Sequence, residues 1–432
     1  MKVCVLGLWH LGTVTAACLA AAGHDVTGLD FDASVIENLA GGKPPLFEPG
    51  LEDLVKSGLA SGRLSFTTDV AAALGAADVV WVAYDTPVDD DDRADVEYVT
   101  ERIARVFPYV RDGALVLISS QLPVGTTRQL EQRFASDARG RRVGFGCSPE
   151  NLRLGKAIAV FTQPDRIVAG VRAEADREHV RELLRPFDPN IEWVSVESAE
   201  MTKHALNAFL ATSVTFINEI ASLCEQVGAD ATEVERALKS EARIGPKAYL
   251  SPGPAFAGGT LARDVVFLSQ LGGALGVPTG LLSAVKSSND AHRQWPQRRI
   301  EQRFPDLRGR TVAVWGLTYK PGTDTLRRST SIELCRWLHH QGVTVRAHDQ
   351  AVRALPVELA ARIELVDSAL AAAQGASAVV VATPWPEYKE ISAGDLKARM
   401  VRALVIDPGR FLVDTLGRGD GIEYVSVGTA GA

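Results

Sequence analysis

Residues 1 to 30 read MKVCVLGLWHLGTVTAACLAAAGHDVTGLD, and this stretch decides the fold. The short apolar run Lys2 to Leu6 predicts a strand that is buried on both faces. Gly7 to Gly12 predicts a turn, and the alanine-rich segment up to about Ala22 predicts a helix. Asp25 to Asp30 predicts the next strand. The chain therefore opens with a strand, a turn, a helix and a second strand.

The turn Gly7-Leu-Trp-His-Leu-Gly12 is a degraded form of the GxGxxG fingerprint of dinucleotide-binding turns. Trp9 replaces the middle glycine, which normally lets the backbone approach the pyrophosphate. Asp30 ends the second strand, where a carboxylate accepts ribose hydroxyls and repels a 2′-phosphate. This pattern favours NAD over NADP, and the alternative is a glycine turn without a cofactor. The predicted NAD-binding residues here are Gly7, Trp9, His10, Leu11, Gly12 and Asp30.

The alternation of strands and helices continues along the chain and then recurs. Residues 79–83, 114–118 and 143–147 predict further strands, and a second strand-turn-helix-strand pattern begins at Thr311. Such alternation is typical of a parallel α/β sheet. The predicted fold class is α/β, with two Rossmann-like, doubly wound domains.

A different segment lies between these two patterns. Residues 200–227 hold no glycine or proline and repeat apolar side chains at helical spacing, which predicts one long central helix. We therefore divide the chain into an N-terminal NAD-binding Rossmann-like domain at 1–198, a central helical region at 199–295 and a C-terminal Rossmann-like domain at 296–432.

Composition excludes several classes of partner. The 432 residues carry a net charge of −7, whereas a nucleic-acid-binding protein needs a basic face. No apolar run approaches the ~20 residues that span a bilayer, and the first residues lack the order of a signal peptide, so we expect a cytoplasmic protein without a membrane partner. The five cysteines are scattered without CxxC spacing, which predicts free thiols and no metal site.

Several motifs lie where chemistry is expected, beyond strand ends or on the predicted helix. After the first turn they are, in order, Thr86-Pro87, Pro123-Val-Gly-Thr-Thr127, Ser148-Pro-Glu-Asn-Leu-Arg153, the pair Lys203 and Asn207, Arg243-Ile-Gly245, the segment Pro252 to Asp264, and Gly316-Leu-Thr-Tyr-Lys-Pro-Gly-Thr-Asp324 with Arg327 and Ser329. Lys203 and Asn207 are four residues apart and share one face of the helix.

Together these motifs resemble the UDP-glucose/GDP-mannose dehydrogenase family over nearly the whole chain. The resemblance implies two Rossmann-like domains joined by a long helix, with NAD bound by the first. It implies that a UDP- or GDP-sugar is bound largely by the central and last domains, and that the protein is a homodimer through the central helix. Members of the family oxidise a sugar C6 alcohol to a carboxylate in two hydride transfers.

The resemblance also implies roles for individual residues. Lys203 would stabilise an oxyanion or take the alcohol proton, Asn207 and Asp264 would position substrate and water, and Glu150 would order the hydrolytic water. Cofactor-side residues implied in addition to the turn are Thr86, Pro87, Gln121, Arg263 and Arg327. Substrate-side residues implied are Glu150, Asn151, Leu152, Arg153, Lys203, Asn207, Arg243, Tyr249, Phe256, Gly258 and Lys320.

One departure from the family changes the expected chemistry. The family's loop reads approximately GFGGSCxxKD with a nucleophilic cysteine, whereas Ala255 to Asp264 here places Thr260 at that position. Gln121 and Arg263 replace a threonine and a lysine. A thiol with a pKa of ~8.5 is readily activated, but a threonine hydroxyl needs a strong adjacent base.

The absence of a cysteine at this position predicts a two-electron alcohol oxidation, or an oxidation followed by re-reduction, in place of efficient four-electron oxidation. Three alternatives stay open. They are slow direct oxidation of the aldehyde hydrate, a non-catalytic binding protein, and a dehydrogenase of plain hydroxy acids. Cys147, three residues before Glu150, is either a substitute thiol or a small buried residue.

Overall fold

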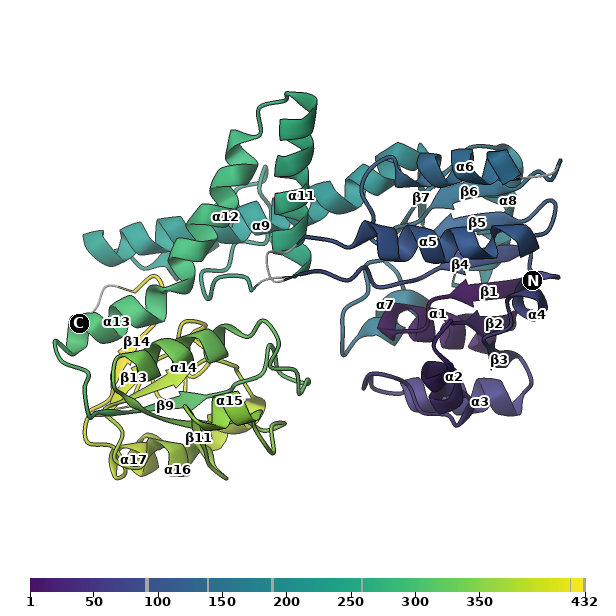
Figure 1. The fold of residues 1–432 in the computed structure, drawn as a ribbon. Helices are drawn as coiled ribbons and strands as arrows, with labels where there is room; N and C mark the ends of the chain where they lie inside the picture. Colours follow the sequence, from purple (N-terminus) through teal and green to yellow (C-terminus); the bar gives the residue numbers. More distant parts are fainter. Residues whose placement is uncertain (90–92, 138–139, 188–189, 258, 420, 430–432) are drawn as a thin grey trace. The chain divides into compact units, whose positions relative to one another are not determined.

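The computed structural model describes residues 1–432 except 90–92, 138–139, 188–189, 258, 420 and 430–432. The chain divides into two compact units, Met1–Leu206 and Asn207–Ala432. Each unit contains a sheet of mostly or wholly parallel strands with helices against it, and the long helix α9 carries the chain from one unit into the other (Figure 1). The predicted α/β fold class is therefore confirmed.

Unit 1 is built on an eight-stranded sheet of order β3-β2-β1-β4-β5-β6-β7-β8. The strand order reverses between β1 and β4, which is the switch point where open α/β sheets bind ligands. The strands are β1 (Lys2–Leu6), β2 (Asp25–Leu29), β3 (Leu64–Thr67), β4 (Val79–Val82), β5 (Leu115–Ile118), β6 (Gly144–Cys147), β7 (Ile167–Val171) and β8 (Ile191–Val194).

One pair of strands departs from the predicted parallel arrangement, because β6 and β7 are antiparallel. The connection between them, residues 148–166, contains only the short helix α7 (Ala157–Thr162). A parallel connection would have to cross the face of the sheet, usually with a longer helix. This connection instead stays at the edge where β6 ends, and it carries the predicted motif around Glu150.

Helices cover both faces of this sheet (Figure 1). The helices α1, α3, α7 and α8 contribute to the hydrophobic core on one face, and α4, α5 and α6 to the core on the other. Their bounds are α1 (His10–Ala21), α2 (Ala33–Ala40), α3 (Leu51–Ala60), α4 (Val70–Leu74), α5 (Val96–Val106), α6 (Thr126–Asp137) and α8 (Glu174–Leu184), with short 3₁₀ turns at Phe107–Tyr109 and Arg185–Phe187.

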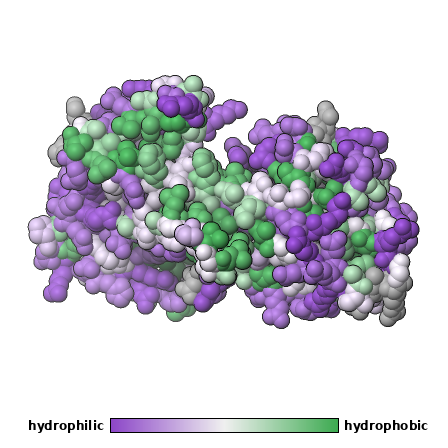
Figure 2. All heavy atoms as spheres, turned by 90° about the horizontal axis from the view of Figure 1, so that it is seen from above, coloured by the Kyte–Doolittle hydropathy of each residue, from purple (hydrophilic) through white to green (hydrophobic). Residues whose placement is uncertain are grey.

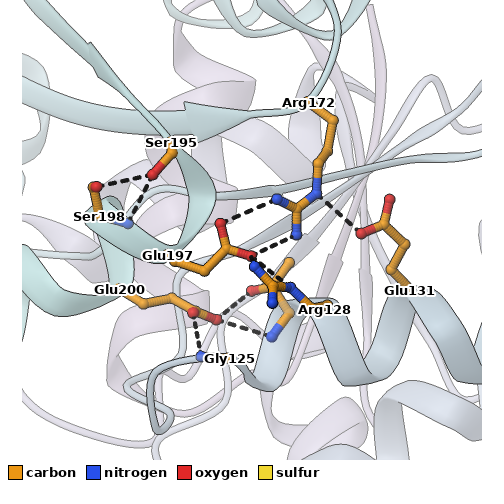
Figure 3. Close-up of polar contacts among 9 residues, drawn as sticks. Gly125, Arg128, Glu131, Arg172, Ser195, Glu197, Ser198 and Glu200 are labelled. Carbon is orange, nitrogen blue, oxygen red and sulfur yellow. Dashed lines mark hydrogen bonds and ion pairs between the residues drawn. The ribbon is translucent and has the colours of Figure 1, made fainter.

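The long helix α9 runs over Val196–Val227 and begins four residues before the predicted start at Glu200. The earlier start follows from a cap, because the Ser195 hydroxyl oxygen accepts the N–H of Ser198 at 3.2 Å (Figure 3). The helix ends at Val227, and the next residue, Gly228, has a φ of +79°, the left-handed conformation that favours glycine.

Within the described residues, α9 is the one helix long and apolar enough to cross a membrane by length and composition. Core helices pass the same test. The side chains of Ala199, Ala211 and Ala221 on α9 are fully buried within their own units, which is typical of a core helix.

Unit 2 contains a six-stranded sheet of order β11-β10-β9-β12-β13-β14, with every adjacent pair parallel. Its strands are β9 (Thr311–Trp315), β10 (Thr344–His348), β11 (Glu364–Leu365), β12 (Ala378–Val381), β13 (Leu404–Ile406) and β14 (Glu423–Val425). Its helices are α10 (Ala231–Ser240), α11 (Thr260–Leu275), α12 (Gly280–Arg293), α13 (Trp295–Arg303), α14 (Thr330–His340), α15 (Val357–Ala360), α16 (Ala369–Ala373) and α17 (Ala393–Lys397), with a 3₁₀ turn at Pro386–Glu390.

Candidate functional site

The turn between β1 and α1 has the backbone of a dinucleotide-binding turn. Gly7 has a φ of +92°, and a Cβ at this position would lie 2.6 Å from the Tyr84 ring. A Cβ on Gly12 would lie 1.7 Å from the carbonyl oxygen of Gly7. Neither position accepts a side chain, so both glycines are required by the geometry of the turn.

Trp9 is compatible with this backbone. Its φ of −79° is open to any residue, and it precedes the first residue of α1. The indole is 49% exposed. The substitution therefore leaves the turn intact and places an accessible indole beside the N-terminus of α1, where a pyrophosphate is expected.

Asp30 holds the turn and remains accessible. Its carboxylate accepts the N–H of Leu8 at 2.8 Å and that of Asp32 at 3.1 Å, one on each oxygen. The side chain is partly exposed. Each oxygen keeps a further lone pair, so this carboxylate can accept ribose hydroxyls.

The corresponding carboxylate of unit 2 is closed off. Asp349, after β10, is 2% exposed and accepts the N–H groups of Leu317 and Thr318, the Thr318 hydroxyl and the Trp385 indole on a single oxygen. Its other oxygen accepts the N–H of Ala351. Because the Asp349 carboxylate is buried, it cannot bind a ribose as the partly exposed Asp30 can.

The loops after β4 and β5, which carry predicted cofactor-side residues, are connected by a hydrogen bond in unit 1. The Thr86 hydroxyl, after β4, donates to the carbonyl oxygen of Gln121, after β5, at 2.7 Å. Thr86 is buried and Gln121 is half-buried, and Pro87 follows on the same loop as Thr86. These loops lie beyond adjacent strands on one side of the switch point.

Lys203 and Glu150, which come from different motifs, are in contact in unit 1. The Lys203 side-chain nitrogen donates to the carbonyl oxygen of Glu150 at 2.6 Å and lies 3.3 Å from its carboxylate. It also donates to the Asn151 side chain at 3.4 Å. Lys203 is 8% exposed, so it is not a solvated surface residue. Leu152 donates its N–H to the Glu150 carboxylate at 2.7 Å, whereas Arg153 is exposed.

Glu200 fixes the loop after β5 to the same helix, and sequence reasoning missed it. Its buried carboxylate accepts the N–H of Gly125 at 2.6 Å, the N–H of Thr127 at 2.8 Å and the Thr127 hydroxyl at 2.6 Å (Figure 3). One turn further along, a ring nitrogen of His204 bonds the carbonyl oxygen of Leu122 at 2.9 Å. Helix α9 therefore holds the loops after β5 and β6 in a fixed register.

Cys147 lies beside these residues but is not a candidate nucleophile. The side chain is buried, and burial together with the nearby Glu200 charge raises the pKa of its thiol well above the usual value. A thiol that stays protonated is a poor nucleophile. The interpretation of Cys147 as a small buried residue is therefore supported.

The remaining predicted catalytic residues lie in unit 2. Asp264, on α11, is fully buried and accepts a hydrogen bond from the Asn207 amide. Thr260 is the first residue of α11, one turn before Asp264, and its side chain is exposed. Arg263 is half-buried on the same helix.

Two loops of unit 2 carry the other predicted residues. The loop between α10 and α11 holds the exposed Arg243 and Tyr249, and Phe256, whose backbone N–H and carbonyl are both bonded to the Asn289 side chain at 3.0 and 2.9 Å. The loop between β9 and α14 holds the half-buried Lys320 and the exposed Arg327. Gly258 lies outside the described residues.

Comparison with known protein families finds three consecutive matches. They are the UDP-glucose/GDP-mannose dehydrogenase family NAD binding domain at residues 1–188, its central domain at 197–291 and its UDP binding domain at 313–414. The first match confirms the predicted cofactor, NAD, and agrees with the open Asp30 of unit 1.

Individual relatives match nearly the whole chain. A UDP-glucose 6-dehydrogenase from Pseudomonas aeruginosa is 35% identical over 94% of this chain and 93% of its own. The solved structure of a UDP-glucose dehydrogenase from Pyrobaculum islandicum is 32% identical, covers 99% of this chain and 98% of its own, and has a TM-score of 0.89. That of a UDP-D-ManNAc dehydrogenase from Pyrococcus horikoshii is 25% identical, covers both chains fully and has a TM-score of 0.86.

Proposed function

Because the chain belongs to the UDP-glucose/GDP-mannose dehydrogenase family, we propose that it oxidises a hydroxyl group of a UDP-sugar and removes two electrons rather than four. Membership makes the chain an NAD-dependent dehydrogenase. The observation that carries the finer proposal is the exposed Thr260 hydroxyl at the start of α11, where the family resemblance places the nucleophilic cysteine.

A UDP-sugar is the substrate that the comparisons favour. The third family match is described as a UDP binding domain, and the relatives named above act on UDP-glucose or UDP-D-ManNAc. Lys320 lies on the β9–α14 loop of that domain, and Arg243 and Tyr249 lie on the α10–α11 loop. We assign these three side chains to the nucleotide and the sugar.

Unit 1 fits the cofactor. Gly7 and Gly12 form the tight turn, α1 presents its N-terminus, and the accessible Asp30 carboxylate suits a ribose and opposes a 2′-phosphate. NAD, when bound, supplies a hydride acceptor.

Removal of a hydride from a carbinol leaves the hydroxyl proton to be taken up. We assign this proton to Lys203, whose buried nitrogen is held by Glu150 and Asn151. Asn207 and Asp264, which bond each other in unit 2, orient the reacting hydroxyl and water.

The second oxidation of the family needs a covalent thiol adduct of the aldehyde, and no thiol is suitably placed. All five cysteines are buried. Burial raises the pKa of Cys147 well above its usual value and those of Cys4, Cys18 and Cys335 to about 12. A threonine hydroxyl is far less acidic than a thiol. The expected product is therefore an aldehyde or ketone, or an isomer formed by re-reduction.

The proposal is tested by the yield of NADH per sugar. Purified protein is incubated with NAD and a panel of UDP-, GDP- and dTDP-sugars, NADH is followed by absorbance, and products are identified by mass. We expect no more than about one NADH per sugar converted. About two, with a uronate as product, would overturn the proposal.

We also propose a homodimer formed through α9. Phe209, Phe216 and Leu223 recur every seven residues along this helix and are 67%, 46% and 62% exposed. Exposed apolar side chains in such a row are typical of helix-helix interfaces. Figure 2 shows that hydrophobic residues gather in patches on the face of the protein drawn there. Sedimentation of a Phe216→Glu variant as a monomer is the expected result.

A further inference from the structure

Glu48 is a buried carboxylate with three donors from two different segments of unit 1. It is 4% exposed and lies in the connection between α2 and α3. One carboxylate oxygen accepts hydrogen bonds from the ring N–H at Nε2 of His10, at 2.9 Å, and from the backbone N–H of Gly155, at 2.8 Å. The other accepts the N–H of Ala157 at 2.9 Å.

The first of these segments is the cofactor turn. His10 is the first residue of α1, directly after Trp9, and its side chain is 13% exposed. A pyrophosphate bound at this helix N-terminus would be held by the backbone N–H groups of these residues. A ligand on the turn therefore acts on the residue that donates to Glu48.

The second segment is the connection that follows Glu150. Gly155 has a φ of +84°, and Lys156 donates its N–H to the carbonyl oxygen of Arg153 at 2.8 Å, so residues 153–156 form a closed turn. Glu48 binds this turn through Gly155 and binds the start of α7 through Ala157. At the other end of the segment, the Glu150 carboxylate is held by Lys203.

We propose that Glu48 is a positioning residue that couples the cofactor turn, residues 7–12, to the segment 150–157. When NAD occupies the turn, His10 is held in place, and its hydrogen bond to Glu48 restrains that carboxylate. Glu48 in turn restrains the segment through Gly155 and Ala157, and with it the Glu150–Lys203 pair. The inference rests on the proposed function for the role of Glu150 and Lys203 toward the sugar. The physical link itself is independent of the sugar.

Two variants remove different hydrogen bonds to Glu48. In Glu48→Gln the side chain keeps its size, but its NH₂ group faces at least one of the three donors, so one of them loses its acceptor. In His10→Phe an aromatic ring stays at this position, but the donor to Glu48 is removed. Glu52→Gln is the matched control, because Glu52 is exposed on α3 and is paired with Lys56.

The test is hydrogen-deuterium exchange of peptides covering residues 150–160, with and without saturating NAD and without any sugar. In the natural protein, NAD should slow exchange in these peptides by about threefold or more. Glu48→Gln should raise the exchange rate of this segment by about tenfold without NAD. Without NAD, His10→Phe should exchange at the same rate as the natural protein, but addition of NAD should not slow it further. Glu52→Gln should behave as the natural protein in both conditions.

Two results would overturn the coupling. One is a His10→Phe protein that binds NAD and still transmits the full response, and the other is unchanged exchange in Glu48→Gln. Peptides from β4 report whether each variant is folded, and if Glu48→Gln is not, His10→Phe decides the question. Since no sugar is present, the exchange experiment tests the coupling even if the proposed sugar oxidation is wrong.

Discussion

The Lys203 side-chain nitrogen lies 3.3 Å from the Glu150 carboxylate and donates to the Glu150 carbonyl oxygen at 2.6 Å. These two residues are 53 positions apart in the sequence and come from α9 and from the connection after β6. Because the lysine is buried and held by the backbone as well as by the carboxylate, its position is fixed before any substrate arrives. This fixed nitrogen is the basis of the proposed chemistry.

Replacing Lys203 with alanine should therefore lower kcat by about 100-fold to 10,000-fold, the usual contribution of a positioned acid or base. Steady-state kinetics with the UDP-sugar identified by the panel would measure kcat and KM separately. Lys56→Ala, on the exposed surface of α3, is the control. A Lys203→Ala protein with an unchanged kcat would remove this residue from the reaction.

Asp30 should determine the choice of cofactor. Its replacement with serine removes the carboxylate that holds Leu8 and opposes a 2′-phosphate, so NAD affinity should fall by about tenfold and the preference over NADP should narrow. Titration calorimetry with both cofactors measures this. Asp32→Asn, at the exposed start of α2, should bind NAD normally. An undiminished preference for NAD in Asp30→Ser would contradict the assignment.

Thiol reagents should leave activity intact. All five cysteines are buried, and Cys147 stays protonated because burial and the Glu200 charge raise its pKa. Treatment with iodoacetamide at pH 8 should therefore cause no inactivation over the time that inactivates a Thr260→Cys variant, whose new thiol is exposed. Inactivation of the natural protein with modification of Cys147 would contradict the assignment of this residue as a buried, unreactive thiol.

Acid should weaken the ion-pair network that ties α9 to its own unit. Hydrogen bonding with Arg172 lowers the pKa of Glu197 from 4.5 to about 2 (Figure 3). A lowered folded-state pKa stabilises the protein above the unfolded value, and this contribution is lost as pH falls from 4.5 toward 2.

At pH 7, Glu197→Gln should cost roughly 1 kcal/mol in the free energy of unfolding, a modest value because the network is partly exposed and screened. Urea denaturation at several pH values would show the difference between the two proteins shrinking on acidification. A difference that stays constant down to pH 2 would contradict this origin.

Much of the fold could be predicted from the sequence, because buried parallel strands are apolar runs between glycine turns. The strand at Lys2–Leu6 is predicted with both ends correct. The start of α9 was not, since Ser195 acts as a cap only through its bond to Ser198. The antiparallel strand β7 was also missed, because its direction depends on where the preceding connection runs.

Of the site, the sequence indicated residues that belong to motifs, including Lys203, Glu150 and Asp264. It did not indicate Glu48 or Glu200, whose partners lie 107 and 75 residues away, because no local pattern marks a carboxylate that accepts distant backbone N–H groups. The individual roles, the homodimer and the cytoplasmic location remain predictions.

The most direct test of the central claim is the number of NADH molecules formed per UDP-sugar consumed, measured for the natural protein and for Thr260→Cys. We expect no more than about one NADH for the natural protein, and a rise toward two when the thiol is supplied. About two NADH with Thr260 in place, accompanied by uronate, would contradict it.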